Sequence, residues 1–342
     1  MKVVYDPRHE GHAPRTFLVR GRLVASPEGP ARAEALLARA RADGHPIVAP
    51  RAFAPALRAA VHGPDYLRFL ETAHDRWQAL AGADDEVLPN VHPNRHAAAY
   101  PQGIVGQAGH HMVDTACPIG AATWEAACAA AEVAATAAAL VREGAPAAYA
   151  LCRPPGHHAY PDVAGGFCYL NNVAIAAAEM RAQHDRVAIL DIDVHHGNGT
   201  QAIFYDRADV LFASVHADPA DFYPFFAGYA HERGAGPGLG YSRNLPLAPG
   251  ADDRAWLTAV ESALSLVRAF APGALLVSLG FDAFAGDPLS PLAVTTEGFA
   301  AAARAIAGLA LPTVLVQEGG YDCASLGDNL GAFLAAFEGG AG

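Results

Sequence analysis

Cysteine is scarce in this sequence, and the few cysteines form no recognisable framework. The chain has 342 residues and five cysteines. Their number is odd and none forms a CxxC pair, which excludes a disulfide-stabilised scaffold. The pattern is typical of free thiols in a reducing compartment, so we expect a cytoplasmic protein.

An uninterrupted apolar span and an excess of positive charge are also missing. The apolar stretch 121–141 contains Trp124, Glu125 and Glu132, so it predicts a buried helix rather than a membrane span. Residues 1–6 resemble a short strand and lack the features of a secretion signal. The net charge of −12 repels phosphate backbones. We therefore expect neither a nucleic-acid partner nor a membrane partner.

Motifs for a covalent serine nucleophile and for nucleotide binding are missing as well. The sequence has no GxSxG elbow and no Walker phosphate loop. No internal repeat or linker divides the chain. With 52% apolar and 17% charged residues, it has the composition of a globular protein with a large core. We expect a single domain over residues 1–342.

Short β-branched runs alternate with alanine-rich stretches along the chain. Strands are predicted at 2–5, 147–152, 186–191, 210–215, 274–279 and 313–317. Helices are predicted at 123–142, 171–183, 252–270, 296–309 and 325–337, with Thr296 as an N-cap. This alternation indicates an α/β fold with a mostly parallel central sheet and helices on both faces.

Polar residues follow four of the predicted strands, where ligands bind in such folds. After the strand at 186–191, Asp191, Asp193 and His195 alternate with apolar residues. Residues two apart on an extended chain point the same way, so Asp193 and His195 can reach one ion, with Asp191 behind them. Asp282, at the end of another strand, supplies a third ligand. Two carboxylates and an imidazole suit catalytic zinc and also iron(II) or cobalt; the alternative is solvated carboxylates with a structural histidine.

Acid–base groups follow two other strands. Two carboxylates cancel the charge of zinc, so the site needs a separate base and a separate oxyanion donor. His157 and His158 come after the rigid segment 154–156; one can take a proton from the attacking water and pass it to the leaving amine, and the other can hold charge. Tyr321, after two glycines, can donate to an oxyanion. Together these residues predict metal-assisted amide hydrolysis, and the alternative for the histidine pair is solvent exposure.

Several segments carry a family resemblance. Those that resemble histone deacetylase-like amidohydrolases of the arginase–deacetylase superfamily are 153–159, 165–172, 191–200, 278–282 and 318–321. Those that resemble the bacterial acetylpolyamine amidohydrolases within this group are 30–34, 69–77, 123–127 and 217–229. The resemblance extends from Val3 to about Phe337 and implies an arginase/deacetylase fold.

The resemblance also implies two ions. Asp193, His195 and Asp282 would bind one catalytic Zn²⁺. A structural K⁺ would lie nearby. The residues around it would be Asp191, Asp193, His195, Ser214 and Val215, some of which would contribute backbone oxygens.

The resemblance gives each acid–base group a role. His157 would pair with Asp191 and act as an electrostatic partner, and His158 would be the general base and then the acid. Tyr321 would polarise the substrate carbonyl. Asn198 stands where some relatives have an aspartate behind the second histidine. A neutral partner raises the imidazole pKa less than a carboxylate does, which favours a neutral base.

The resemblance further implies a narrow substrate tunnel closed by a second subunit. Phe167 and Tyr223 would form its aromatic walls, with Gly166 also in contact with substrate. A loop inserted at about 90–120 would narrow the active site of the partner in a homodimer. Within it, Val105 stands where a glutamate would help to hold a polyamine, and Asp114 replaces a second glutamate.

The predicted function is therefore zinc-dependent hydrolysis of the acetyl amide of acetylated polyamines or small N-acetylated diamines. The expected partner is a small cationic acetylated amine. One alternative is a deacylase of acetyl-lysine in peptides or proteins, which would need a more open tunnel. The other is a non-catalytic acyl-amine binding protein, which the loss of Tyr321 or of a zinc ligand would indicate.

Overall fold

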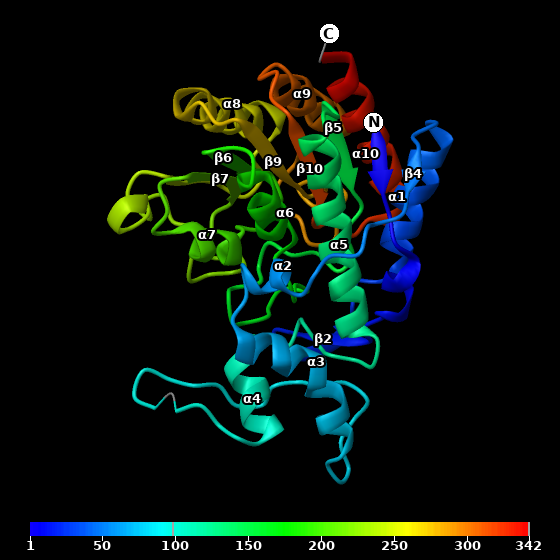
Figure 1. Cartoon of the computed structure of the whole chain (residues 1–342), viewed down its shortest axis with the longest axis vertical. Helices are drawn as coiled ribbons and strands as arrows, with labels where there is room; N and C mark the ends of the chain where they lie inside the picture. The colour runs from blue at the N-terminus through cyan, green and yellow to red at the C-terminus, as the bar shows by residue number, and fades with distance from the viewer. Residues whose placement is uncertain (98, 341–342) are drawn as a thin grey trace.

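The computed structural model describes residues 1–97 and 99–340. Residue 98 of the predicted 90–120 loop and the last two residues of the predicted domain lie outside this range. An eight-stranded sheet forms the centre of the molecule (Figure 1), and all seven pairings between its neighbouring strands are parallel. The predicted α/β fold with a mostly parallel sheet is confirmed.

The strands follow an order that differs from their order in the sequence. Across the sheet they are β4 (Ile47–Val48), β1 (Lys2–Val4), β5 (Ala147–Ala150), β10 (Thr313–Gln317), β9 (Ala274–Leu279), β6 (Val187–Asp191), β7 (Val210–Ala217) and β8 (Ser242–Leu247). A separate antiparallel hairpin consists of β2 (Thr16–Val19) and β3 (Arg22–Ala25). All six predicted strands are present, whereas β4, β8 and the hairpin were not predicted.

Helices cover both faces of the sheet because its strands bear apolar side chains on both sides. Neighbouring residues of β6 show this: Leu190 belongs to one core cluster and Ile189 to the other. The helices on the Leu190 face are α1 (Pro30–Ala42), α8 (Asp253–Phe270), α9 (Thr296–Ala307) and α10 (Cys323–Gly340). Those on the Ile189 face are α5 (Thr123–Arg142), α6 (Asn172–Arg181) and α7 (Asn198–Phe204).

A third, smaller core lies beyond the α5 side of the sheet. It includes side chains of α3 (Pro64–Gln78) and α4 (Ile104–His111), which lie at the bottom of Figure 1 together with the segment around residues 90–120. The remaining short elements are α2 (Ala56–Ala59) and two 3₁₀ turns, η1 (Pro7–Gly11) and η2 (Gly236–Gly238). None of these was predicted.

Helix α5 is long and apolar enough to cross a membrane by composition alone, but 78% of its most apolar window is buried in the protein. It packs against α6 and β5, so it is a core helix, as predicted.

The predicted N-cap of α9 is wrong by one residue. Thr295 has the extended backbone of a cap, and its hydroxyl accepts a hydrogen bond from the Gly298 amide at 3.2 Å. The hydroxyl of Thr296, already in the helix, instead donates to Asn329 Oδ1 at 2.6 Å. Because Thr295 and Thr296 have the same side chain, the sequence does not show which of them is the N-cap. The backbone conformation decides it.

Candidate active site

The predicted functional segments converge because their strands are neighbours. Strands β5, β10, β9 and β6 are adjacent and parallel, so their carboxyl ends lie at one edge of the sheet. The segments that follow them, 153–158, 318–321, 281–287 and 191–198, therefore meet there.

The three predicted metal ligands lie together and are buried. Candidate ligand atoms of Asp193, His195 and Asp282 all lie within 4.8 Å of one another. His195 Nδ1 is 3.2 Å from Asp193 Oδ1 and 3.1 Å from Asp282 Oδ2. Asp191 lies behind this group, as predicted, and its Oδ1 accepts a hydrogen bond from the Asp193 amide at 3.1 Å.

The charge of this group fits a divalent cation. Among the described residues, no lysine or arginine forms an ion pair with Asp193 or Asp282. Burial and the charge of Asp193 raise the pKa of Asp282 to about 7. Burial lowers the pKa of His195, but hydrogen bonds to both carboxylates outweigh it and raise the value to about 9. Two buried carboxylates that share one imidazole attract positive charge, and the oxygen and nitrogen donors suit zinc.

The two adjacent histidines have opposite electrostatic surroundings. His157 Nδ1 is 3.0 Å from Asp191 Oδ2. Burial lowers the pKa of His157, but the charges of Asp193 and Asp191 raise it to about 10. Burial and the nearby positive histidines lower the pKa of His158 well below its usual value. These surroundings favour an imidazolium at His157 and a neutral imidazole at His158, and a neutral imidazole is the form that can act as a general base.

The tautomer of His158 follows from its partner. His158 Nδ1 lies 2.7 Å from Asn198 Oδ1, while Asn198 Nδ2 donates to the Tyr160 hydroxyl at 3.2 Å. An amide oxygen only accepts, so Nδ1 of His158 carries the proton. Its Nε2 lone pair is then available to accept a proton from water.

Contacts of its ring hold Tyr321 in place, and its hydroxyl remains available for a substrate. Its ring centroid lies 5.6 Å from that of Phe167, and the Arg32 guanidinium carbon lies 4.6 Å from it. The hydroxyl forms no hydrogen bond with any residue that the structure describes. It can therefore donate to a substrate carbonyl.

The glycines before Tyr321 allow a close approach of the backbone to the predicted metal ligands. The Gly319 amide donates to Asp193 Oδ2 at 2.7 Å. A Cβ atom at Gly319 would lie 2.1 Å from Asp282 Oδ2, and Gly320 has a φ of +122°. Both positions require glycine, which explains the turn that carries the phenol.

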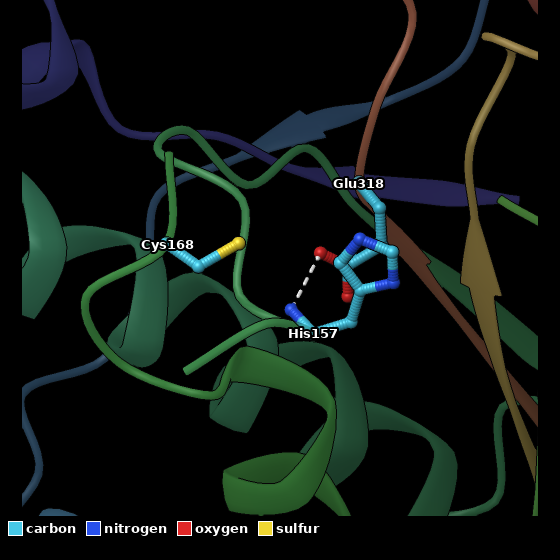
Figure 2. A group of neighbouring side chains, drawn as sticks. All are labelled: His157, Cys168 and Glu318. Carbon is cyan, nitrogen blue, oxygen red and sulfur yellow. Dashed lines mark hydrogen bonds between the residues drawn. The ribbon is translucent and has the colours of Figure 1, made fainter. Parts of the chain in front are cut away.

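Glu318 anchors the histidine loop, a role that sequence reasoning missed. Its Oε2 accepts hydrogen bonds from the amides of Gly156 at 2.7 Å and His157 at 3.1 Å, the second of which Figure 2 shows. Its Oε1 accepts from Ser278 Oγ at 3.1 Å. Cys168 lies beside the pair in Figure 2, and burial raises the pKa of its thiol. A carboxylate occupied by three donors beside a protonated thiol is an anchor rather than a second metal site.

A buried charge cluster supports the same turn from behind. Arg32 donates to the carbonyl oxygens of Glu318 and Gly320, both at 2.6 Å. Glu28 accepts from Arg32 at 2.9 Å and from Arg153 at 3.0 Å. Although burial raises the pKa of Glu28, these arginines hold it well below its usual range. Arg32 and Arg153 lie in segments that carry the family resemblance, 30–34 and 153–159, but only the structure gives them partners.

The predicted substrate-contact residues lie around the same point. The Tyr223 ring meets His158 edge-on with centroids 5.0 Å apart, and Phe167 contacts Tyr321. Asp114 Oδ2 accepts from the Tyr223 hydroxyl at 2.7 Å and from the Gly166 amide at 3.1 Å. Asp114 thus connects the 90–120 segment to Tyr223 and Gly166.

Two further aromatic residues contact these side chains or the predicted metal ligands. Phe222 stacks on His195 with centroids 4.8 Å apart and an interplanar angle of 15°. The ring centroid of Phe17, on the β2–β3 hairpin, lies 5.6 Å from that of Phe167. Phe222 lies in segment 217–229, which carries the family resemblance, whereas nothing in the sequence indicated a role for Phe17.

The predicted K⁺ residues are neighbours in the sheet. Asp191 on β6 lies opposite Ser214 on β7, with Val215 next to it, and all three are fully buried. Ser214 Oγ lies 2.8 Å from His216 Nδ1. The K⁺ site stays a prediction.

A buried group that could hold a metal ion, a histidine pair and a tyrosine lie together at the edge of a parallel sheet, an arrangement suited to the hydrolysis of an amide. The histone deacetylase domain family matches residues 26–337. The chain belongs to this family and is a deacetylase-type amidohydrolase, as the resemblance predicted.

Individual relatives are similar over the whole chain. An acetylpolyamine amidohydrolase of Burkholderia pseudomallei is 51% identical, with 98% of each chain covered. One of Mycoplana ramosa is 41% identical over 99% of this chain and 100% of its own. A crystal structure of the acetylpolyamine aminohydrolase from B. pseudomallei superimposes with a TM-score of 0.97 over 100% of both chains at 50% identity.

Proposed function

We propose that the chain is a zinc-dependent deacetylase of acetylated polyamines or small N-acetylated diamines. One observation carries this proposal. His158 and Tyr321 both adjoin the buried group formed by Asp193, His195 and Asp282: the His158 ring centroid lies 5.8 Å from that of His195, and the Gly319 amide, two residues before Tyr321, donates to Asp193 Oδ2. The names of the full-length relatives support the substrate class.

The mechanism divides the reaction among the side chains of this chain. Zn²⁺ bound by the three ligands would polarise the substrate carbonyl and acidify water. His158 Nε2 accepts the proton of the attacking water, and Tyr321 donates a hydrogen bond to the developing oxyanion. The imidazolium of His157 stabilises this charge. His158 then gives its proton to the amine nitrogen as the amide C–N bond breaks.

Charge supports a small cationic substrate. The net charge of −12 favours cations in general, and Asp114 places a carboxylate beside Tyr223. Acetyl-lysine peptides are the second candidate. Val105, where an acidic residue would hold a polyamine, is 36% exposed and offers no charge, which favours this alternative.

We extend the proposal to the assembly, the second ion and the compartment. The 90–120 segment exposes Val91, Tyr100, Val105 and Val113, and an apolar surface of this kind supports a homodimer. K⁺ would lie beside Asp191. Five free cysteines support a cytoplasmic location.

The experiment is a substrate panel on zinc-loaded protein, with the mass in solution measured by light scattering. Acetylated putrescine and cadaverine should give a higher kcat/KM than an acetyl-lysine peptide, and the mass should be that of a dimer. Tyr321→Phe should lower kcat by about 10²–10³-fold, the cost of losing one oxyanion donor. Full activity of this variant on an unactivated amide would contradict the mechanism, and a preference for the peptide would contradict the substrate.

A further inference from the structure

Asp287 is a buried carboxylate that the mechanism does not use. It lies in the loop after β9 and is 6% exposed. Its Oδ2 accepts hydrogen bonds from the amides of Tyr321 at 2.6 Å and Asp322 at 3.0 Å. Its Oδ1 accepts from the Leu289 amide at 2.9 Å. The carboxylate therefore binds the backbone of the residue that carries the phenol.

The charge of Asp287 is costly where it lies. No arginine or lysine among the described residues forms an ion pair with it, and burial raises its pKa. A buried charge without a cation is stable only when hydrogen bonds satisfy it. Here three amides do so, and charge-assisted bonds of this kind are about twice as strong as neutral ones. The turn around Tyr321 thus receives stronger anchors than a neutral side chain would provide.

The loop that carries Asp287 also carries a metal ligand. Asp282 lies five residues earlier. The Ala285 amide donates to the Val294 carbonyl at 2.8 Å, which closes the loop. On the other side of the turn, the Gly319 amide donates to Asp193. The backbone before and after the phenol is therefore fixed to the two loops that supply the metal ligands.

We infer that Asp287 is a positioning residue that holds the Tyr321 hydroxyl at the substrate carbonyl through its hydrogen bonds to the backbone of Tyr321 and Asp322. This inference rests on the proposed role of Tyr321 as oxyanion donor. A loss of these bonds would let the phenol turn away while the metal ligands stay in place.

The test is a double-mutant cycle. Asp287→Asn keeps the size of the side chain but removes its charge and replaces one acceptor by a donor. It should lower kcat by about 10- to 100-fold, the order of effect that a small misplacement of a reacting group produces, with KM and zinc content unchanged. In the Tyr321→Phe background the same change should have no effect, since the hydroxyl is already absent. A trifluoroacetyl amide keeps the residual rates measurable.

The control is Asp252→Asn. This carboxylate also accepts a hydrogen bond from a backbone amide, that of Ala255 at 3.0 Å, but it caps α8 outside the active site, so its loss should leave kcat within a factor of two. Asp287→Glu keeps the charge but displaces it, and a partial loss of kcat is expected. This variant takes the place of Asp287→Asn in the cycle if the asparagine variant fails to fold.

The outcomes separate the two proposals. Normal activity of Tyr321→Phe on an unactivated acetyl amide would overturn the proposed mechanism, on which this inference rests. Loss of activity in Tyr321→Phe together with normal activity in Asp287→Asn would overturn the inference and leave the function standing. An equal loss from Asp287→Asn in both backgrounds, or a loss of zinc, would also overturn it, since Asp287 would then act on the fold or on the metal site.

Discussion

His157 and His158 are adjacent in the sequence, and their ring centroids lie 4.1 Å apart. Their hydrogen-bond partners differ by one atom type: Asp191 offers a carboxylate to the first, and Asn198 an amide oxygen to the second. A carboxylate favours the imidazolium form, whereas an amide does not compensate for burial. One substitution at the partner should therefore change which protonation state the second histidine prefers.

Asn198→Asp should raise the pKa of His158. Because the base must be neutral to accept a proton, a higher pKa moves the acid limb of the kcat/KM profile to higher pH. An added carboxylate contact changes such a pKa by about 1–3 units. Rates measured from pH 5 to 9 would show the shift.

Asn329→Asp is the matched control for this prediction. Asn329 is also buried, but it accepts its hydrogen bond from Thr296 on α9, outside the active site. Its replacement should leave the acid limb in place. An unchanged limb in Asn198→Asp itself would show that His158 is not the base.

Sequence reasoning at the residue scale found the groups that follow a local pattern. Asp193 and His195 alternate with apolar residues, and Tyr321 follows two glycines. Asp287 and Glu318 were not assigned a role, because each acts through backbone amides that are 34 to 162 positions away in the chain. Almost every residue has a backbone amide, so the sequence does not indicate which amide a distant carboxylate will bind. Such contacts appear only in the folded structure.

At the scale of elements, burial decided which strands could be predicted. Strand β9 is buried at all six positions, and five of its six residues are apolar. Strand β8 begins Ser-Arg-Asn and is buried at only two of six positions, and β4 has two residues. Edge strands carry a weaker apolar pattern because one side lacks a neighbour. The sequence therefore predicts the middle of the sheet and not its edges.

Helix α4 should control the preference for a second positive charge. It carries Val105, which is partly exposed in the 90–120 segment. Val105→Glu should lower KM a few-fold for acetylated substrates with a second ammonium, because an exposed ion pair contributes about 0.2–1 kcal/mol. It should leave KM for a neutral N-alkylacetamide unchanged.

Val105→Gln separates charge from size in this experiment. The glutamine variant should resemble the parent protein on every substrate. High salt should remove the gain of the glutamate variant, because mobile ions screen exposed charges. An equal gain in both variants would contradict an electrostatic role for this position.

For the whole molecule, buried histidines couple stability to pH. His62 is one example: its Nε2 accepts from the Asn171 amide at 2.9 Å, and its Nδ1 lies 3.0 Å from the Tyr160 carbonyl. An amide donates and a carbonyl accepts, so these contacts need the neutral ring with its proton on Nδ1. Burial lowers the pKa of His62 to about 4, and burial lowers that of His216 to about 4 as well.

The free energy of unfolding should therefore fall as the pH decreases from about 6.5 to about 4 on account of these groups. In this range the unfolded chain binds protons at these histidines and the folded chain does not, which favours unfolding at lower pH. One such group contributes a slope of at most about 1.4 kcal/mol per pH unit. Buried carboxyl groups with raised pKa values, such as that of Glu318 at about 7, act in the opposite direction. The pH dependence of stability in the parent protein alone thus does not isolate one residue, but a difference between variants does.

His62→Gln keeps a hydrogen-bond donor and an acceptor but has no titratable group. Urea unfolding at several pH values should therefore show a smaller decrease in the free energy of unfolding on acidification than in the parent. His231→Gln, at an exposed position, should leave the pH dependence unchanged, and equal slopes for all three proteins would show that His62 is not held neutral by the fold.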